Sequence, residues 1–226
     1  MIADIVRFAL PTIYPITDTA ISGLSHRDQV KQLIGGGATL IQLREKRASP
    51  HEFFQDAREA LSIAHSADVR LIINDRVDIA LAIGADGVHL GQTDMPVEAA
   101  RRLLGEHAII GVSTHRLDQV REAVRWPIDY LAFGPIYSTA TKENPDPIVG
   151  LRELAQIKNV AGALPLVAIG GITADTIREV LRSGADSVAV ISAVLNGPNP
   201  IAENLRSHIL LLQVEGREVG RAKRIN

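Results

Sequence analysis

The chain has 226 residues, and its 24 basic side chains nearly balance its 26 acidic ones, which leaves a formal charge of −2. The absence of cysteine excludes disulfide frameworks, zinc knuckles, iron–sulfur clusters and thiol nucleophiles. The near-neutral charge argues against wholesale nucleic-acid binding. Aromatic residues make up only 4% of the chain, so we expect polar and aliphatic groups to hold any organic ligand.

Short apolar strands alternate with amphipathic helices along the whole chain. The predicted strands cover residues 12–16, 39–43, 70–73, 86–90, 108–112, 129–133, 166–169 and 186–190. A helical pattern follows each of them, for example at residues 53–64, 97–104, 117–124, 151–158, 176–182 and 201–212. This alternation predicts parallel strands that are joined by helical crossovers.

Three glycines repeat one pattern, in which Gly37, Gly84 and Gly184 each precede an alanine and the start of a strand. We expect each of them to end a helix in the left-handed conformation. Their spacings of 47 and 100 residues are about two and four units of roughly 25 residues. Eight such units predict a single-domain (β/α)₈ TIM barrel over residues 1–212, followed by a flexible C-terminal tail at 213–226. An open doubly wound sheet is disfavoured, because no Gly-x-Gly-x-x-Gly follows the first strand.

No targeting or membrane segment is expected. Residues 1–7 lack a cationic stretch followed by a long apolar run, and no stretch approaches the roughly 20 apolar residues of a membrane helix. We therefore expect a cytoplasmic protein with small-molecule substrates and with neither a nucleic-acid nor a membrane partner. Formation of a homo-oligomer stays open.

Polar residues follow the second, third and fourth strands, where a barrel of this kind places its active site. Alternation puts Gln42, Arg44 and Lys46 on one face, which predicts an anion site, although a solvated loop gives the same triplet. Asp75 and Asp94 come after the next two strands. Carboxylates completed by waters and a phosphate suit Mg²⁺, whereas each aspartate alone serves equally well as a helix N-cap.

The later loops predict further anion contacts. Ser113 follows the fifth strand and is placed either to donate to a phosphate or to cap the next helix. The long segment 134–150 carries hydroxyls and the ammonium of Lys142, and its length permits a lid. His89 and His115 are assigned no catalytic role.

After the seventh and eighth strands, Gly171 and Ser192 lie in loops that usually bind phosphate in such barrels, although tight turns are the alternative. The loops together predict two anion sites in one mouth, one for a multiply charged phosphate with metal and one for a monophosphate.

Six segments, taken as an ordered set, resemble the thiamine-phosphate synthase family over nearly the whole chain. They are residues 42–46, 74–76, 89–94, 111–115, 139–142 and 170–173. The family is a (β/α)₈-barrel transferase of thiamine biosynthesis. It joins 4-amino-2-methyl-5-hydroxymethylpyrimidine diphosphate to 4-methyl-5-hydroxyethylthiazole phosphate, with Mg²⁺, and releases diphosphate. One departure is Ser138, where proline is expected before the first threonine.

The resemblance implies a role for each matching residue. The pyrimidine diphosphate would be bound by Gln42, Leu43, Arg44, Glu45, Lys46, Asn74, Ser113 and Lys142, and the catalytic residues among them would be Arg44, Lys46, Ser113 and Lys142. One Mg²⁺ would be held by Asp75 and Asp94, although Mn²⁺ accepts the same ligands. The thiazole phosphate would be bound by Thr139, Ala140, Thr141, Gly171, Ile191 and Ser192.

Two alternatives remain, a thiazole tautomerase-like isomerase and a non-catalytic phosphate-binding barrel. Isomerases of that kind generally lack the metal aspartate of the fourth loop and part of the diphosphate clamp. This chain retains Asp94, Arg44, Lys46 and Lys142, which favours the synthase.

Overall fold

The structure is a computed structural model that describes residues 10–139, 141 and 146–222. Two predicted site residues, Ala140 and Lys142, lie outside the described residues.

Eight parallel strands close into one barrel in chain order. The closure is made by β1 and β8, where Ile13 is aligned with Val188. The strands are β1 (Ile13–Asp18), β2 (Leu40–Arg44), β3 (Arg70–Asn74), β4 (Gly87–Leu90), β5 (Ile109–Thr114), β6 (Tyr130–Phe133), β7 (Leu166–Ile169) and β8 (Ser187–Val190). The predicted TIM barrel is confirmed, and each strand ends within two residues of its predicted bounds.

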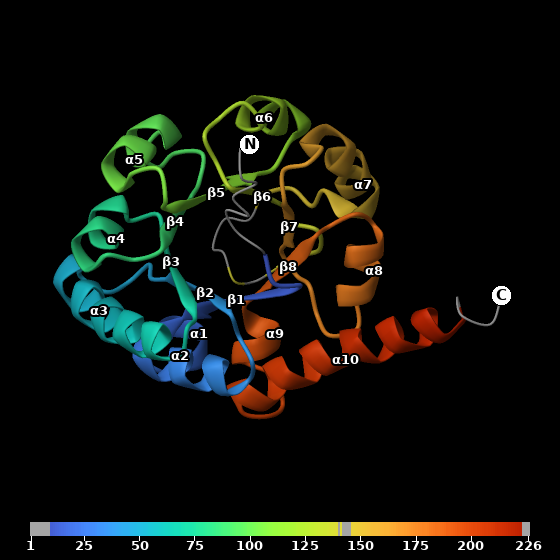
Figure 1. The fold of residues 1–226 in the computed structure, drawn as a ribbon, viewed down its shortest axis with the longest axis horizontal. Helices are drawn as coiled ribbons and strands as arrows, with labels where there is room; N and C mark the ends of the chain where they lie inside the picture. Colours follow the sequence, from blue (N-terminus) through green and yellow to red (C-terminus); the bar gives the residue numbers. More distant parts are fainter. Residues whose placement is uncertain (1–9, 140, 142–145, 223–226) are drawn as a thin grey trace, which may run out of the picture.

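A ring of helices surrounds the barrel (Figure 1). The helices are α1 (Thr19–Ser22), α2 (His26–Gly35), α3 (Pro50–Ser66), α4 (Val77–Ile83), α5 (Val97–Leu104), α6 (Leu117–Ala123), α7 (Gly150–Ala161), α8 (Ile177–Arg182), α9 (Ser192–Leu195) and α10 (Ile201–Ala222). Within the described ranges, none of the helices combines the length and apolarity needed to span a bilayer.

The helices differ from the prediction at two places. The sequence predicts a helix after every strand, and α2 and α4 are the helices after β1 and β3, for which no bounds were predicted; α1 and α9 are additional short helices. Helix α2 buries His26 and Gln29 beside Val30 and Leu33, so its inner face lacks the apolar stripe that marks an amphipathic helix. Helix α10 continues to Ala222, so the predicted C-terminal tail is helical over much of its length.

The strands separate two apolar layers. Inside the barrel lies a cluster formed by Tyr14, Ile16, Leu40, Ile72, Ile109, Tyr130, Ala132, Val167 and Ala189. A larger cluster fills the space between the strands and the surrounding helices. Side chains of a strand alternate between its faces, so buried apolar residues on both faces explain the continuous apolar runs of the sequence.

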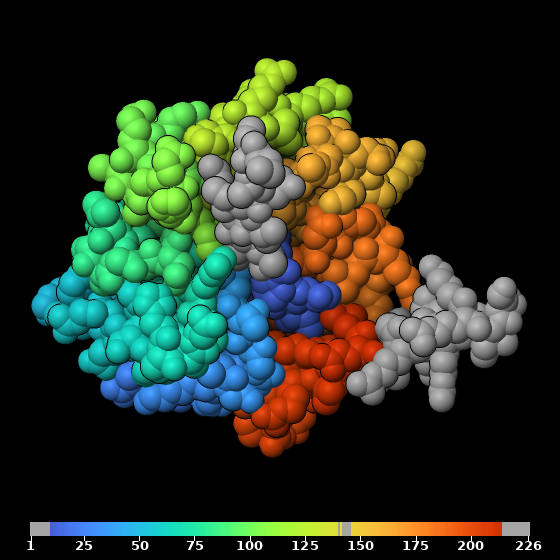
Figure 2. Space-filling view, viewed as in Figure 1, coloured from blue at the N-terminus to red at the C-terminus, as the bar shows by residue number. Residues whose placement is uncertain are grey.

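The last helix packs beside the first module. Figure 2 shows successive modules in successive sectors around the ring, with α10 (red) next to the blue N-terminal sector. Helix α10 contacts α2, and Gly36 permits this approach, because a Cβ there would lie 2.8 Å from the carbonyl oxygen of Ala202. The ring of helices is therefore closed by the same two ends of the chain that close the barrel.

Candidate active site

A cavity of about 460 Å³ opens at the C-terminal ends of the strands. It is lined by most of the predicted site residues that the structure describes: Gln42, Arg44, Lys46, Asn74, Asp75, Asp94, Ser113, Thr139, Thr141, Gly171, Ile191 and Ser192. The alternation rule is confirmed for Gln42, Arg44 and Lys46, which all line this cavity. Leu43 and Glu45 are not among its lining residues. Leu43 packs instead in the outer apolar cluster.

The two cations of β2 and its loop are both paired with carboxylates. Arg44 forms an ion pair with Asp18, and Lys46 forms one with Asp75. Asp18 is itself fixed, because its Oδ1 accepts the N–H of Ala20 at 3.0 Å and of Ile21 at 3.2 Å. The Arg44 guanidinium is therefore held in place by the cap of α1 before any ligand arrives.

The two aspartates form a carboxyl pair rather than helix caps. The N-cap residues of α4 and α5 are Arg76 and Pro96, and neither makes a side-chain cap. Asp75 lies in the left-handed region, with φ 63°. Asp94 Oδ2 accepts the N–H of Gly91 at 2.7 Å. Burial raises the pKa of Asp94, and the neighbouring Asp75 carboxyl raises it further.

This pair fits a divalent cation. Among the residues that the structure describes, no group of three or more acidic or histidine side chains could hold a metal ion. The protein thus offers two carboxylates and leaves the remaining positions to water and a ligand, the arrangement in which Mg²⁺ commonly bridges to substrate phosphates. A cation there would also relieve the repulsion that raises the pKa of Asp94.

A buried chain of hydrogen bonds crosses the floor of the cavity, and the sequence analysis missed it. Gln42 Nε2 donates to the Tyr14 hydroxyl at 3.1 Å, which lies 3.1 Å from the Tyr130 hydroxyl. His89 continues the chain, with Nδ1 2.9 Å from Tyr130 and Nε2 2.8 Å from Ser113 Oγ. Burial lowers the pKa of His89 to about 4. The imidazole is therefore neutral at pH 7 and positions Ser113.

His115 is a second residue that sequence reasoning left unassigned. It lines the cavity, its Nδ1 lies 2.6 Å from the carbonyl oxygen of Gly134, and its Nε2 lies 3.5 Å from Asp146. His115 thus ties the end of β5 to the long segment after β6. Its place at a strand end was a signal, but a lone histidine gives no sign of such partners.

The loop after β7 lies against the loop after β6. Gly170 and Gly171 have φ values of 100° and 65°, and a Cβ on Gly171 would lie 2.3 Å from the carbonyl oxygen of Ser138. Only glycine allows this approach. The contact brings the predicted monophosphate residues of both loops to one side of the cavity.

Fold and site together define a (β/α)₈-barrel enzyme with its functional groups gathered at the C-terminal mouth. Residues 13–194 match the family model described as thiamine monophosphate synthase, and the chain belongs to this family. Membership confirms the resemblance and the prediction of a transferase of thiamine biosynthesis.

Individual relatives agree with the family model. The chain is 47% identical over 195 residues to the thiamine-phosphate synthase of Chloroflexus aurantiacus, which covers 86% of this chain and 88% of the relative. It is 44% identical over 209 residues to the thiamine-phosphate synthase of Methanoregula boonei, and the match covers 91% of this chain and 96% of the relative. Among solved structures, thiamine phosphate pyrophosphorylase from Pyrococcus furiosus superposes with a TM-score of 0.77 at 36% identity, covering 88% of this chain and 95% of that one. A 3-hexulose-6-phosphate synthase, at 16% identity and a TM-score of 0.62, shares the fold alone.

Proposed function

We propose that this chain condenses 4-amino-2-methyl-5-hydroxymethylpyrimidine diphosphate with 4-methyl-5-hydroxyethylthiazole phosphate, and that the products are thiamine phosphate and diphosphate. The supporting observation is the division of one cavity into two sides. Arg44, Lys46 and the aspartate pair line one side and suit a multiply charged phosphate, whereas Thr139 and Gly171 belong to loops that suit a monophosphate. Both substrates are small phosphorylated metabolites, and cytoplasmic location is part of the proposal.

The proposed reaction needs charge stabilisation and no proton transfer. The bond between the exocyclic CH₂ of the pyrimidine and the diphosphate oxygen breaks, and its electron pair leaves with diphosphate. The electron-rich ring stabilises the cation, and the thiazole nitrogen then supplies the electron pair of the new C–N bond. Arg44 and Lys46 would stabilise the charge that develops on the leaving group. The low pKa of His89 agrees with the absence of an acid–base step.

The rest of the cavity would orient the second substrate and exclude water. The monophosphate side, with Thr139, Thr141, Gly171, Ile191 and Ser192, would hold the thiazole in line with the cation. Ile16, Val167, Ile169 and Ala189 also line the cavity. Aliphatic walls of this kind cannot hydrogen-bond a water that would otherwise capture the cation.

Asp75 and Asp94 are proposed to hold one Mg²⁺. When bound there, the ion would act as a Lewis acid that neutralises charge on the diphosphate oxygens. Asp94 is fixed by the Gly91 N–H, and Asp75 is fixed through its own N–H, which donates to the His89 carbonyl at 2.8 Å. The carboxyl pair is therefore held in place by backbone bonds as well as by Lys46.

The test uses purified protein, both substrates and Mg²⁺, with diphosphate and thiamine phosphate as the measured products. We expect diphosphate release that requires both substrates. Arg44→Met should lower kcat/KM by about 100-fold or more, whereas Arg27→Met, which removes a surface arginine paired with Glu59, should leave it unchanged. Isomerisation of the thiazole without diphosphate release would support the tautomerase alternative, and no turnover at all would refute both enzymes.

A further inference from the structure

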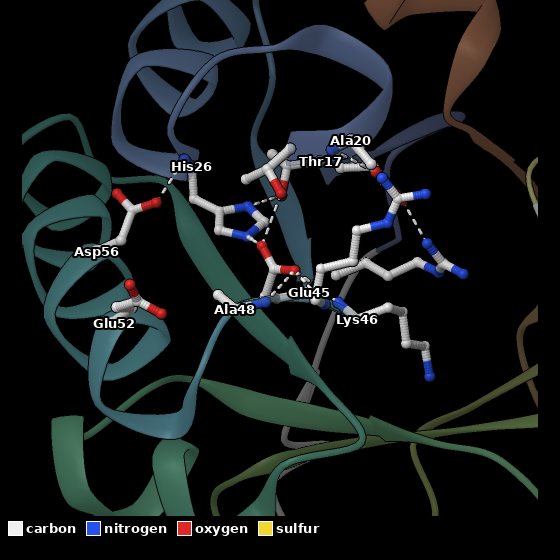
Figure 3. A network of polar contacts seen from close by, with 12 residues as sticks. Thr17, Ala20, His26, Glu45, Lys46, Ala48, Glu52 and Asp56 are labelled. Carbon is white, nitrogen blue, oxygen red and sulfur yellow. Dashed lines mark hydrogen bonds and ion pairs between the residues drawn. The ribbon is translucent and has the colours of Figure 1, made fainter.

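Behind the mouth, the Glu45 carboxylate folds back onto its own loop. Its Oε1 accepts the three backbone N–H groups that follow in the chain, those of Lys46 at 2.8 Å, Arg47 at 2.7 Å and Ala48 at 3.1 Å. The side chain is only 5% exposed. Figure 3 shows the carboxylate lying between His26 and the backbone of this loop. One oxygen thus orders three consecutive peptide groups.

The other oxygen of Glu45 anchors the loop to the first module. Oε2 accepts the Thr19 hydroxyl at 2.7 Å and lies 3.3 Å from His26 Nε2. The ring of His26 is buried, and its Nδ1 lies 2.7 Å from Thr17 Oγ1. Thr17 in turn donates to the Gln42 carbonyl at 3.3 Å. Contacts therefore connect the loop after β2 to β1, to the start of α2 and back to β2 itself.

These contacts leave the Glu45 side chain no role as a ligand for a diphosphate. Five donors surround a group that has about four lone-pair positions. The hydrogen bond from His26, more than any other contact, lowers the pKa of Glu45 strongly, so the group is an anion that would repel a phosphate. In Figure 3 the Lys46 side chain extends away from Glu45, on the opposite side of the loop.

The acidic side chains beside this network have structural partners of their own. An outer cavity of about 450 Å³ lies next to Glu45 and His26. Glu52 accepts the N–H of Ser49 at 2.9 Å and completes the capping box of α3. Asp56 accepts the N–H of His26 at 2.7 Å, at the start of α2. These carboxylates cap helices, and the network serves the loop rather than a second ligand.

We infer that Glu45 is a positioning residue, which holds the loop after β2 so that Lys46 faces the mouth beside Arg44. The inference rests on the proposed function, in which these two cations bind the diphosphate. A loop that is already ordered loses less conformational freedom when its cations meet the ligand, and small displacements of charged groups greatly reduce their effect on a reacting centre. Glu45 acts through the backbone and touches no substrate.

The experiment compares Glu45→Ala and Glu45→Gln with Glu52→Gln as the matched control, since Glu52 is a second carboxylate that accepts local backbone and hydroxyl hydrogens. We expect Glu45→Ala to lower kcat/KM for the pyrimidine diphosphate by about 10- to 100-fold, the range typical of residues that orient a functional group. The KM for the thiazole phosphate should stay within about twofold. Glu45→Gln keeps one acceptor oxygen for the loop and should fall between Glu45→Ala and the wild type. Glu52→Gln should match the wild type kinetically.

Calorimetric titration with inorganic diphosphate and Mg²⁺ provides a readout that needs no turnover. We expect Glu45→Ala to weaken this binding by about tenfold or more, while Glu45→Gln covers the case in which the alanine variant does not fold. Equal diphosphate affinity in wild type and variants would overturn the inference, as would a parallel rise in both KM values. A wild type that binds diphosphate without turnover would refute the proposed function alone. A wild type that neither binds diphosphate nor turns over the two substrates would overturn both.

Discussion

Replacement of Gly171 by alanine tests the close approach of the two loops on the monophosphate side. Gly171 has φ 65°, and a Cβ there would lie 2.3 Å from the Ser138 carbonyl oxygen and 2.8 Å from the Tyr137 Cβ. Gly84 provides the matched control, because its φ of 72° is similar and nothing lies within 4 Å of its Cβ position. The two substitutions thus share the backbone conformation and differ in crowding.

The expected losses follow from these two features. A left-handed alanine costs about 1–2 kcal/mol relative to a right-handed one, and the stiffer unfolded chain returns about 0.4–1 kcal/mol. Gly84→Ala should therefore lower the free energy of unfolding by about 1 kcal/mol. Gly171→Ala adds crowding against a backbone atom, for which about 1–3 kcal/mol is typical. Its total loss should be about 2–4 kcal/mol, and each kcal/mol lowers Tm by about 2–4 °C in a chain of this size.

Urea denaturation of both variants measures the stability difference, and steady-state kinetics measures the consequence for the site. Gly171→Ala should raise the KM for the thiazole phosphate by about tenfold or more, because a displacement near 1 Å can greatly reduce productive binding. Gly84→Ala should leave both KM values unchanged. Equal losses of unfolding free energy in the two variants would show that the loops are not in contact, and an unchanged KM in Gly171→Ala would remove Gly171 from the binding site.

Three further predictions concern buried charge, protonation and metal. Arg101→Met should lower the free energy of unfolding by about 3–5 kcal/mol, because it leaves the Asp129 carboxylate, 2.7 Å from the guanidinium, buried without its cation. Arg102 is exposed, so the control Arg102→Met should lower the free energy of unfolding by less than about 0.5 kcal/mol. Urea denaturation measures both variants. The pKa of His89 falls from 6.5 to about 4 on folding, so the unfolded chain binds its proton first and stability drops as pH falls from 6.5 to 4, by about 3 kcal/mol in all. His89→Gln should flatten that part of the pH–stability curve, and an unchanged slope would contradict the assignment. Mg²⁺ should raise the Tm of the wild type and not of Asp94→Asn, and activity that survives a chelator would refute the metal site.

The barrel could be predicted because its signals are local. Apolar runs, helical periodicity and the glycine that precedes three of the strands all lie within single modules. The bounds of helix α2 could not be predicted, since its inner face buries His26 and Gln29. The partners of these two side chains lie in β1, namely the Thr17 hydroxyl and the backbone N–H of Asp18.

The site was predictable to the extent that side-chain direction follows strand alternation. Alternation placed Gln42, Arg44 and Lys46 correctly, and the same rule separates Glu45 from them. The carboxylates were ambiguous, because an aspartate that caps a helix and one that faces a ligand look alike in sequence. The folded structure distinguishes them, because the N-cap residues of α4 and α5 are Arg76 and Pro96 rather than the two aspartates. The hydrogen bonds that run from Tyr14 through Tyr130 and His89 to Ser113 join four strands that are far apart in the sequence. They therefore leave no local pattern in the sequence.

The pairing of β1 with β8 has a consequence for how the protein is made. The two strands lie at opposite ends of the barrel sequence, yet Ile13 is aligned with Val188 and Pro15 with Val190. During synthesis, β1 emerges from the ribosome long before its partner exists, and contacts this distant in sequence form slowly. Until Val190 is added, the growing sheet has two unpaired edges, which are templates for pairing with other chains. The nascent chain therefore exposes unpaired strand edges until β8 has been made and pairs with β1.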